Sequence, residues 1–261
     1  MRGNNTGKPA LLTVDDALAA IIATLPHTGT NLLPLSDALG YTLAEDLAAR
    51  LTLPPQAVSA MDGYAVRGED VSSLPCQLTR VAESAAGHPW FGAINEGQAV
   101  RVFTGAVLPD GADTIIIQED VDPVAEDNGI NITVRNAEPV GRYIRPAGLD
   151  VTEGQIILRA GTQLSARAIG LASAAGLTKA VVSLRPRIGV LSTGDELVSP
   201  GTIPGPGQII SSNASFLRGF MAASGAEVVD LGIVRDTSGA MLSRVRSAKN
   251  LDLVVTTGGA S

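Results

Sequence analysis

Residues 59–66 read Ser-Ala-Met-Asp-Gly-Tyr-Ala-Val, and this stretch is the most informative in the chain. It follows directly on the Pro-rich loop of residues 54–56 and places Asp62 in a tight turn before Gly63. An aspartate before a glycine is common turn chemistry, in which the carboxylate accepts hydrogen bonds from nearby backbone N–H groups. The dipeptide alone indicates a turn, and the alternative is that this turn presents the Asp62 carboxylate to a ligand or a metal ion.

The composition limits the classes of function. The 261 residues are 45% hydrophobic, which is enough for two or three compact domains, each with its own core. A formal net charge of -7 argues against a general nucleic-acid binder, whose affinity would rest on clustered Lys and Arg facing phosphates. Aromatic residues make up 3%, too few for a base-stacking platform. A local basic pocket for one small anion stays compatible with this charge.

The cysteine content and the apolar pattern indicate a cytoplasmic protein. The one cysteine, Cys76, excludes an internal disulfide and a Cys-based zinc cluster, and its apolar surroundings predict a small buried side chain in a strand. No apolar run is long enough to cross a bilayer. The polar first eight residues lack the apolar segment of a secretory signal, so a frayed terminus is expected.

The first half of the chain changes pattern from helical to short apolar runs. Thr13 and Asp16 have capping-box spacing, and the apolar residues that follow predict an amphipathic helix ending before Pro26. A second short helix is expected from Ser36, weakened by Gly40. From residue 51 to about 140, apolar runs between Gly, Pro, Asn and Asp predict strands of a small β-domain. These runs are residues 76–81, 99–103, 114–117 and 130–134.

After residue 187 the pattern alternates between strands and helices. Strands are expected at residues 188–192, 228–233 and 251–256, with helices at 214–223 and 240–248 between them. Asn213 is placed to cap the first of these helices and Gly225 to end it. Such an alternation predicts a parallel α/β sheet that binds ligands at the carboxyl ends of its strands, where residues 193–196 and 257–259 fall.

Three further segments, taken with residues 59–66, carry a family resemblance. They are Val-Phe-Thr-Gly-Ala at 102–106 with Pro-Asp-Gly-Ala-Asp at 109–113, Leu-Ser-Thr-Gly-Asp-Glu-Leu at 191–197, and Thr-Thr-Gly-Gly-Ala-Ser at 256–261. In this order they resemble the motifs of the MoeA-like molybdopterin molybdenumtransferases, the family that includes the E domain of gephyrin. The resemblance covers nearly the whole chain from about residue 14. Because family members continue past the position of Ser261, it implies a C-terminally truncated domain.

The resemblance implies a multi-domain α/β plus β fold. A small β-domain, residues 51–140, would be inserted in an elongated α+β central domain formed by residues 29–50 and 141–185. An N-terminal helix within residues 1–28 would pack on the last domain. That domain, residues 186–261, would be an incomplete parallel α/β domain of the molybdopterin-binding, MogA-like type.

The resemblance also implies a site. It assigns Asp62, Thr104 and Glu196 to catalysis, and Asp62, Asp195 and Glu196 to a metal ion. Hard carboxylate oxygens next to a strand end suit Mg²⁺ held against phosphate oxygens. The residues implied to bind substrate are Gly105, Arg142, Arg145, Asp150, Thr193, Gly194, Asp195, Asp236, Gly258, Gly259 and Ser261.

Each of these residues has a plainer alternative. A Thr-Gly pair after a strand is usually a turn, and adjacent carboxylates such as Asp195 and Glu196 are more often a solvated acidic loop. Asp150 and Asp236 also fit exposed loop positions, and Arg142 and Arg145 fit surface ion pairs as well as phosphate contacts. The motif context favours the functional interpretation.

By family resemblance, the implied reaction belongs to molybdenum cofactor biosynthesis. Adenylylated molybdopterin and molybdate would be the substrates, Mg²⁺ the cofactor and AMP the leaving product. The implied assembly is a homodimer with a site shared between subunits, and the molybdopterin adenylyltransferase is a further implied partner; neither nucleic acid nor a membrane is expected. The alternative is a non-catalytic dimeric scaffold, or a molybdopterin-binding fragment that has lost activity through truncation.

Overall fold

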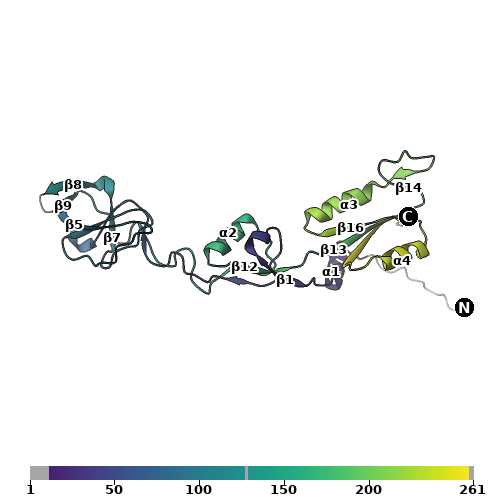
Figure 1. Cartoon of the computed structure of the whole chain (residues 1–261), viewed down its shortest axis with the longest axis horizontal. Coiled ribbons are helices and arrows are strands. Elements are labelled where there is room, and N and C mark those ends of the chain that lie inside the picture. The colour runs from purple at the N-terminus through teal and green to yellow at the C-terminus, as the bar shows by residue number, and fades with distance from the viewer. Residues whose placement is uncertain (1–11, 127–128, 259–261) are drawn as a thin grey trace. The chain divides into compact units, whose positions relative to one another are not determined.

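The computed structural model describes residues 12–126 and 129–258, and the chain divides into two compact units (Figure 1). The unit formed by residues 34–39 and 45–180 is called the β unit below. The α/β unit contains the remaining described residues, from 12 to 33, from 40 to 44 and from 181 onward. Among the described residues, no helix has both the length and the apolar character needed to cross a bilayer.

The β unit is built on a six-stranded sheet with the strand order β7-β4-β6-β5-β9-β8. Neighbouring strands are antiparallel, except that β5 and β6 run parallel. The strands are β4 (Gly63–Val66), β5 (Cys76–Ser84), β6 (Gln98–Val102), β7 (Thr114–Ile117), β8 (Val121–Glu126) and β9 (Gly129–Val134). The four apolar runs expected to be strands are therefore confirmed as parts of β5, β6, β7 and β9.

Strand β4 lies in the interior of this sheet and is buried along its whole length. Successive side chains of a strand point to opposite faces. Accordingly, Tyr64 and Val66 enter one hydrophobic cluster, and Ala65 enters another with Val100 and Ile115. Packing on both faces fixes the position of β4, and with it the Asp62 turn that immediately precedes the strand.

The rest of the β unit consists of short elements. Strand β2 (Leu47–Ala48) pairs with β11 (Ile156–Leu158), and β3 (Val58–Ser59) pairs with β10 (Ile144–Arg145). One α-helix, α2, spans Ala166–Ala174, and single turns of 3-10 helix occur at η1 (Leu35–Asp37), η2 (Gly68–Val71) and η3 (Gln118–Asp120). The helix expected from Ser36 is thus only one turn, closed by the bond from Ala38 N–H to the Leu35 carbonyl.

The α/β unit contains a three-stranded parallel sheet with the order β16-β13-β17. Its strands are β13 (Arg187–Thr193), β16 (Glu227–Val234) and β17 (Leu253–Thr257), and its connecting helices are α3 (Ser212–Ala223) and α4 (Ser238–Ser247). Figure 1 shows α3 and α4 on opposite sides of the sheet. Strand β13 lies in the middle of the sheet. Its connection through α3 leads to β16, and the connection through α4 runs from β16 back to β17 on the other side of β13, so the switch point at which such sheets bind ligands lies between β13 and β17. The expected parallel alternation is confirmed.

The remaining elements of this unit include the N-terminal helix and two strand pairs. Helix α1 spans Val14–Thr24, and Thr13 is confirmed as its N-cap, because Thr13 Oγ1 accepts from Asp16 N–H; the Asp16 carboxylate accepts from the Thr13 hydroxyl. The packing of α1 on the α/β domain stays a prediction. Strand β14 (Leu197–Val198) runs parallel to β15 (Ile209–Ile210), and β1 (Thr30–Pro34) pairs with β12 (Lys179–Ser183).

The predicted N-cap of α3 is wrong, whereas the glycine predicted to end the helix is confirmed. Asn213 is not the cap, as the sequence suggested, because the helix begins at Ser212 and Ser211 occupies the cap position. The Ser211 hydroxyl is used elsewhere, in a buried hydrogen bond of 3.1 Å with the Ser192 hydroxyl. The role of Gly225 is confirmed: with φ of 94° it closes a Schellman motif, in which Gly225 N–H donates to Ala222 and Ala226 N–H to Met221.

Replacing Gly63 by alanine should destabilise the β unit. A Cβ atom at Gly63 would overlap the backbone carbonyl of Ile116 on the neighbouring strand, and backbone cannot move aside as a flexible side chain can. The expected loss is about 3 kcal/mol in the free energy of unfolding, measured by urea denaturation. Gly170→Ala in α2 is the control, because open space surrounds that position, and it should stabilise by about 0.5–1 kcal/mol. Equal stability of Gly63→Ala and the wild type would contradict this packing.

Candidate functional site

The strongest site feature is the contact between Asp62 and Thr104. Antiparallel pairing places Gly63 of β4 opposite Val102 of β6, and the turns next to this pair bring Asp62, the residue before Gly63, to Thr104, two residues after Val102. Asp62 Oδ1 accepts two hydrogen bonds from Thr104, one from the backbone N–H at 2.7 Å and one from the hydroxyl at 2.8 Å. Two residues 42 positions apart, in separate turns, are thereby held together.

The turn that carries Thr104 is held against the loop that carries Asp62. Gly105 N–H donates to the Ser59 carbonyl at 2.8 Å, and Ser59 N–H donates to the Ala106 carbonyl at 2.9 Å. Gly105 has φ of 84°, a conformation that favours glycine. The Ser59 hydroxyl donates to the Met61 carbonyl at 2.6 Å. Residues 59–62 and 104–106 thus form a single hydrogen-bonded assembly, which we call the Asp62 loop pair.

The charge state of Asp62 follows from these bonds. The Thr104 backbone N–H, and then its hydroxyl, hold the pKa of Asp62 below its ordinary value; partial desolvation opposes them, and the positive charge of Arg101 adds to them. Hydrogen bonds that donate to the charged form of a carboxylate favour ionisation. Asp62 is therefore a carboxylate at neutral pH, and it offers oxygen lone pairs to a metal ion or a proton.

Two more predicted residues of the β unit, Arg145 and Asp150, lie beside the loop that leads to Asp62. Arg145 pairs with Val58 in the β3–β10 ladder, and its Nη2 forms an ion pair with Asp150 Oδ2 at 2.7 Å. Asp150 N–H donates to the Leu53 carbonyl at 2.9 Å, at the start of the loop that leads to Asp62. The segment from Leu53 to Asp62 is therefore flanked by Arg145 and Asp150 as well as by Thr104.

Arg142 lies at the same edge. Its Nε forms an ion pair with Glu138 Oε2 at 3.1 Å, and its guanidinium lies over the Tyr143 ring with Cζ 5.1 Å from the centroid. A hydrogen bond with Tyr143 and the charge of Glu138 raise the pKa of Arg142. The Tyr143 carbonyl in turn accepts from Ala60 N–H at 2.8 Å, inside the signature stretch. Both arginines have carboxylate partners here, and their contact with phosphate stays a prediction.

In the α/β unit, the predicted residues gather at the carboxyl ends of β13 and β17. Thr193 ends β13, and its hydroxyl donates to the Thr257 carbonyl at 3.4 Å. Gly258 lies so close that a Cβ on it would overlap the Thr193 carbonyl. Gly194 N–H donates to the Val234 carbonyl of β16 at 3.2 Å. Thr193, Gly194 and Gly258 are thus brought together at the switch point, whereas Gly259 and Ser261 lie outside the described residues.

Asp195 lies in the lining of a depression of about 420 Å³. Its lining includes Gly194, Asp195 and Arg235, and Asp236 follows directly in the chain. The Glu196 carboxylate folds back over its own loop, 2.6 Å from where a Cβ on Gly194 would be, so glycine at 194 makes room for it. Asp195, Glu196 and Asp236 are all exposed.

The three expected metal ligands, Asp62, Asp195 and Glu196, do not form one cluster in the described structure. Within the described residues, no group of three His, Cys, Asp or Glu side chains is arranged to hold a metal ion. Asp62 belongs to the β unit, and Asp195 and Glu196 belong to the α/β unit. Mg²⁺ is commonly bound through one or two carboxylates together with substrate phosphates. The adjacent carboxylates of Asp195 and Glu196 fit that donor set, and the joint role of Asp62 stays a prediction.

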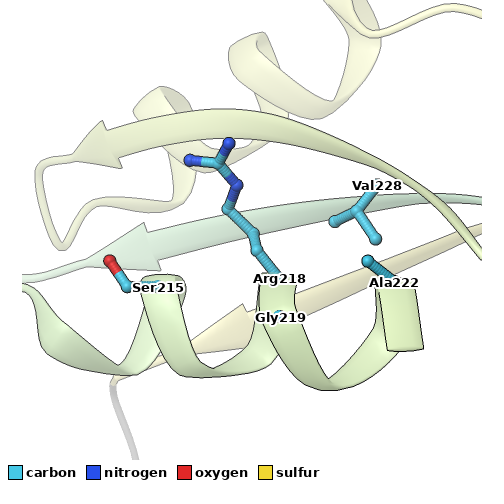
Figure 2. A pocket seen from close by; sticks show the side chains of 5 residues that line it. All are labelled: Ser215, Arg218, Gly219, Ala222 and Val228. Atoms are coloured by element: carbon cyan, nitrogen blue, oxygen red, sulfur yellow. The ribbon is translucent and has the colours of Figure 1, made fainter. Parts of the chain in front are cut away.

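One further pocket lies away from these residues. Figure 2 shows it between α3 and β16, with Ser215, Arg218, Gly219, Ala222 and Val228 around it and Arg218 extending from the helix over the sheet. Arg218 Nη1 forms an ion pair with Asp230 Oδ2 at 2.8 Å. The pocket has a volume of about 410 Å³, and none of the residues predicted from the sequence lines it.

Two family models together match most of this chain. Residues 12–176 match the MoeA N-terminal region, domains I and II, and residues 189–261 match a probable molybdopterin-binding domain. The crystal structure of a molybdopterin biosynthesis MoeA protein from Pyrococcus horikoshii superimposes with a TM-score of 0.84 and 31% sequence identity, over 96% of this chain and 67% of that one. The predicted fold class, a β-domain in an α+β domain followed by a parallel α/β domain, is confirmed.

Curated relatives point to the same family. A molybdopterin molybdenumtransferase from Nostoc sp. is 37% identical over 237 residues, which are 89% of this chain and 53% of that protein. One from Haemophilus influenzae is 35% identical over 253 residues, with 96% and 62% covered. Molybdopterin molybdenumtransferase 2 from Mycobacterium tuberculosis is 39% identical over 236 residues, with 87% and 56% covered.

The chain therefore belongs to the MoeA-like family of molybdopterin molybdenumtransferases. It spans between 53% and 62% of the length of the three curated relatives named above.

Removing the Thr104 hydroxyl should raise the pKa of Asp62. Thr104→Ala deletes one of the two bonds to Oδ1, and the backbone bond remains, so the pKa should stay below the ordinary 3.8. Because the folded pKa is depressed, this carboxylate stabilises the fold above pH 3.8, and the contribution is lost as pH falls through the folded pKa. Thr104→Ala should therefore lose less stability than the wild type as pH falls through the pKa of Asp62.

A ¹³C NMR titration of the Asp62 carboxyl group measures this effect. Thr104→Ser, which keeps the hydroxyl, is the matched control and should titrate like the wild type. An unchanged Asp62 pKa in Thr104→Ala would mean that the hydroxyl bond contributes nothing to the charge state of the carboxylate.

Proposed function

We propose that this chain acts in molybdenum cofactor biosynthesis, as an enzyme that inserts molybdate into adenylylated molybdopterin and releases AMP with the assistance of Mg²⁺. Membership of the MoeA-like family supports the class of reaction. The observation that carries the proposal is the double hydrogen bond from Thr104 to Asp62, which preorganises an ionised carboxylate at the edge of the β unit.

The chemistry of the reaction explains why such a carboxylate is needed. Adenylylated molybdopterin carries a phosphoanhydride and molybdate is an oxyanion, so both reactants are negatively charged. A bound Mg²⁺ would neutralise phosphate charge and polarise the bond that is cleaved. Asp62 stays ionised and fixed in direction by Thr104, which allows it to hold a cation or to orient an attacking oxygen without reorganising.

The α/β unit is proposed to hold the pterin phosphate end of the substrate. Thr193, Gly194 and Gly258 lie together at the switch point, the place where parallel α/β sheets bind ligands. Asp195 and Glu196 are the carboxylates proposed to hold Mg²⁺ there. Asp236, Asp150, Arg142 and Arg145 are proposed to contact the remaining substrate groups. To bind Arg142 and Arg145, a substrate phosphate must compete with the carboxylates of Glu138 and Asp150, which form ion pairs with these arginines.

The assembly proposed for this function is a homodimer in the cytoplasm. Asp62 lies in one compact unit and Glu196 in the other. In the proposed dimer, Asp62 and Thr104 of one subunit face Glu196 and Asp236 of the other, so each site takes residues from both chains. The molybdopterin adenylyltransferase, as the class of enzyme that supplies the adenylylated substrate, is a proposed partner.

The substitutions Asp62→Asn and Glu196→Gln should each abolish molybdate-dependent AMP release. Loss of a group that stabilises transition-state charge lowers turnover by roughly 100-fold or more. The assay supplies adenylylated molybdopterin, Mg²⁺ and molybdate and measures AMP by chromatography. Glu153→Gln is the control, because its side chain is exposed in the β unit and it removes the same charge. AMP release by Asp62→Asn at the wild-type rate would overturn the role of Asp62.

The outcome for the unsubstituted chain separates the enzyme from a binding module. If the chain binds adenylylated molybdopterin in calorimetry and releases no AMP, then the chain is a non-catalytic molybdopterin-binding module. AMP release that requires molybdate establishes the transferase.

Mixed dimers test whether the site is shared. Combining Asp62→Asn chains with Glu196→Gln chains in equal amounts should restore about one quarter of wild-type activity, because a quarter of the shared sites then draw an intact residue from each chain. Size-exclusion chromatography before the assay verifies that dimers have formed. A mixture as inactive as its components would place both residues of each site on one subunit.

A further inference from the structure

Arg101 was not singled out by the sequence, although it lies at the same end of the sheet as Asp62. It is opposite Tyr64 in the β4–β6 ladder, and residues two apart on a strand share a face. Asp62 is two residues before Tyr64, and Phe103 is two residues after Arg101. Asp62 and Phe103 lie just beyond the strand ends, and Arg101 is tied to both, because its guanidinium contacts the Phe103 ring and its charge acts on Asp62.

The guanidinium of Arg101 is held in place. Its Cζ lies 5.0 Å from the centroid of the Tyr64 ring and 5.0 Å from that of Phe103. Nη2 donates to Gln118 Oε1 at 2.6 Å, and Gln118 N–H donates to the Asp62 carbonyl at 3.1 Å. The cation is thus linked through Gln118 to the residue that carries the candidate carboxylate. A group already fixed loses little entropy when it binds a ligand.

Within the described residues the Arg101 guanidinium forms no ion pair with a carboxylate, although its charge acts on Asp62. Seven other arginines form ion pairs with Asp or Glu: Arg67, Arg135, Arg142, Arg145, Arg159, Arg187 and Arg218. Arg101 makes none within 4.0 Å in the described part of the chain, and its hydrogen bond goes to a neutral amide. The exposed Glu83, opposite Arg101 on β5, does not pair with it either. Its remaining N–H groups are available to a ligand.

The donors of the neighbouring turn are already used. Thr104 directs both its N–H and its hydroxyl to Asp62, and Gly105 N–H donates to Ser59. These groups, which the family resemblance assigned to catalysis and substrate binding, therefore serve to build the Asp62 loop pair. The guanidinium of Arg101 is left as the donor that can receive an anion at this end of the sheet.

We propose that Arg101 binds a tetrahedral oxyanion beside Asp62. This rests on the proposed function, which supplies two such groups, the phosphate of the adenylylated substrate and molybdate. The planar fork of a guanidinium matches two oxygens of such a group at once. In this proposal Arg101 binds the anion directly. The cation that accompanies the substrate lies between the anion and the Asp62 carboxylate.

Anion titrations of the full chain test the proposal. The probes are sodium molybdate and sodium pyrophosphate, each followed by calorimetry and by the ¹⁵Nε resonance of Arg101. Arg101→Gln should raise the Kd of at least one anion tenfold or more, and Arg101→Lys should raise it less, because lysine keeps the charge without the fork. Arg80→Gln removes the same charge from the neighbouring strand β5 and should bind like the wild type.

The two probes identify the source of the oxyanion. A loss confined to molybdate assigns the position to the metal oxyanion, and a loss confined to pyrophosphate assigns it to the substrate phosphate. Thermal unfolding verifies that each variant is folded. If Arg101→Gln does not fold, then Arg101→Lys is the variant that is compared with the wild type.

Equal Kd values for Arg101→Gln and Arg80→Gln would overturn the inference, as would a wild-type chain that binds neither anion. Neither result decides the proposed function, which stands or falls on molybdate-dependent AMP release. An Arg101 that binds no anion in a chain that releases AMP would refute this inference alone.

Discussion

The structure of the site depends on the pairing of Gly63 with Val102. Because β4 and β6 are antiparallel, this single register places the residue before one strand next to the turn after the other, so that Asp62 and Thr104 meet. Gly63 also makes room for the carbonyl of Ile116 on the other side of β4. A slip of one residue would turn Tyr64 and Val66 away from their cluster, which holds the register in place.

The same register explains the electrostatics of the site. The pairing places Arg101 opposite Tyr64 at the end of the sheet, where its guanidinium also contacts Phe103 and its charge favours the ionised form of Asp62. The two aromatic rings and Gln118 hold the guanidinium, and Thr104 holds the carboxylate. Two opposite charges are thus fixed close together without forming an ion pair, an arrangement that is useful to ligands carrying both a metal ion and an anion.

The sequence predicted the long and periodic elements well. The four apolar runs of the β unit and the three parallel strands of the α/β unit have strong patterns of their own, and so does the capped helix α1. It did not reveal β4, because Gly63-Tyr64-Ala65-Val66 is too short to show alternation and follows a turn signal. It misplaced the cap of α3, because the Ser211–Ser192 bond that decides it is a tertiary contact.

The candidate site was predictable in its residue types and only partly in its contacts. The family motifs identified Asp62, Thr104, Thr193 and Gly258, and the structure brings the first two together in the β unit and the last two together in the α/β unit. Thr104 directs both of its donors to Asp62, and Arg101 forms no ion pair in the described residues. Both features depend on strand register and on packing between distant residues. No local pattern contains that information.

The most direct test of this account is NMR mapping of the full chain with adenylylated molybdopterin. Backbone and carboxyl resonances would be followed as the nucleotide is added, first without and then with Mg²⁺. The account predicts that the resonances of Asp62 and Thr104 shift together and saturate with the same affinity as those of Thr193 and Gly194. Shifts confined to the α/β unit, with Asp62 and Thr104 unmoved, would show that the Asp62 loop pair has no part in binding the substrate.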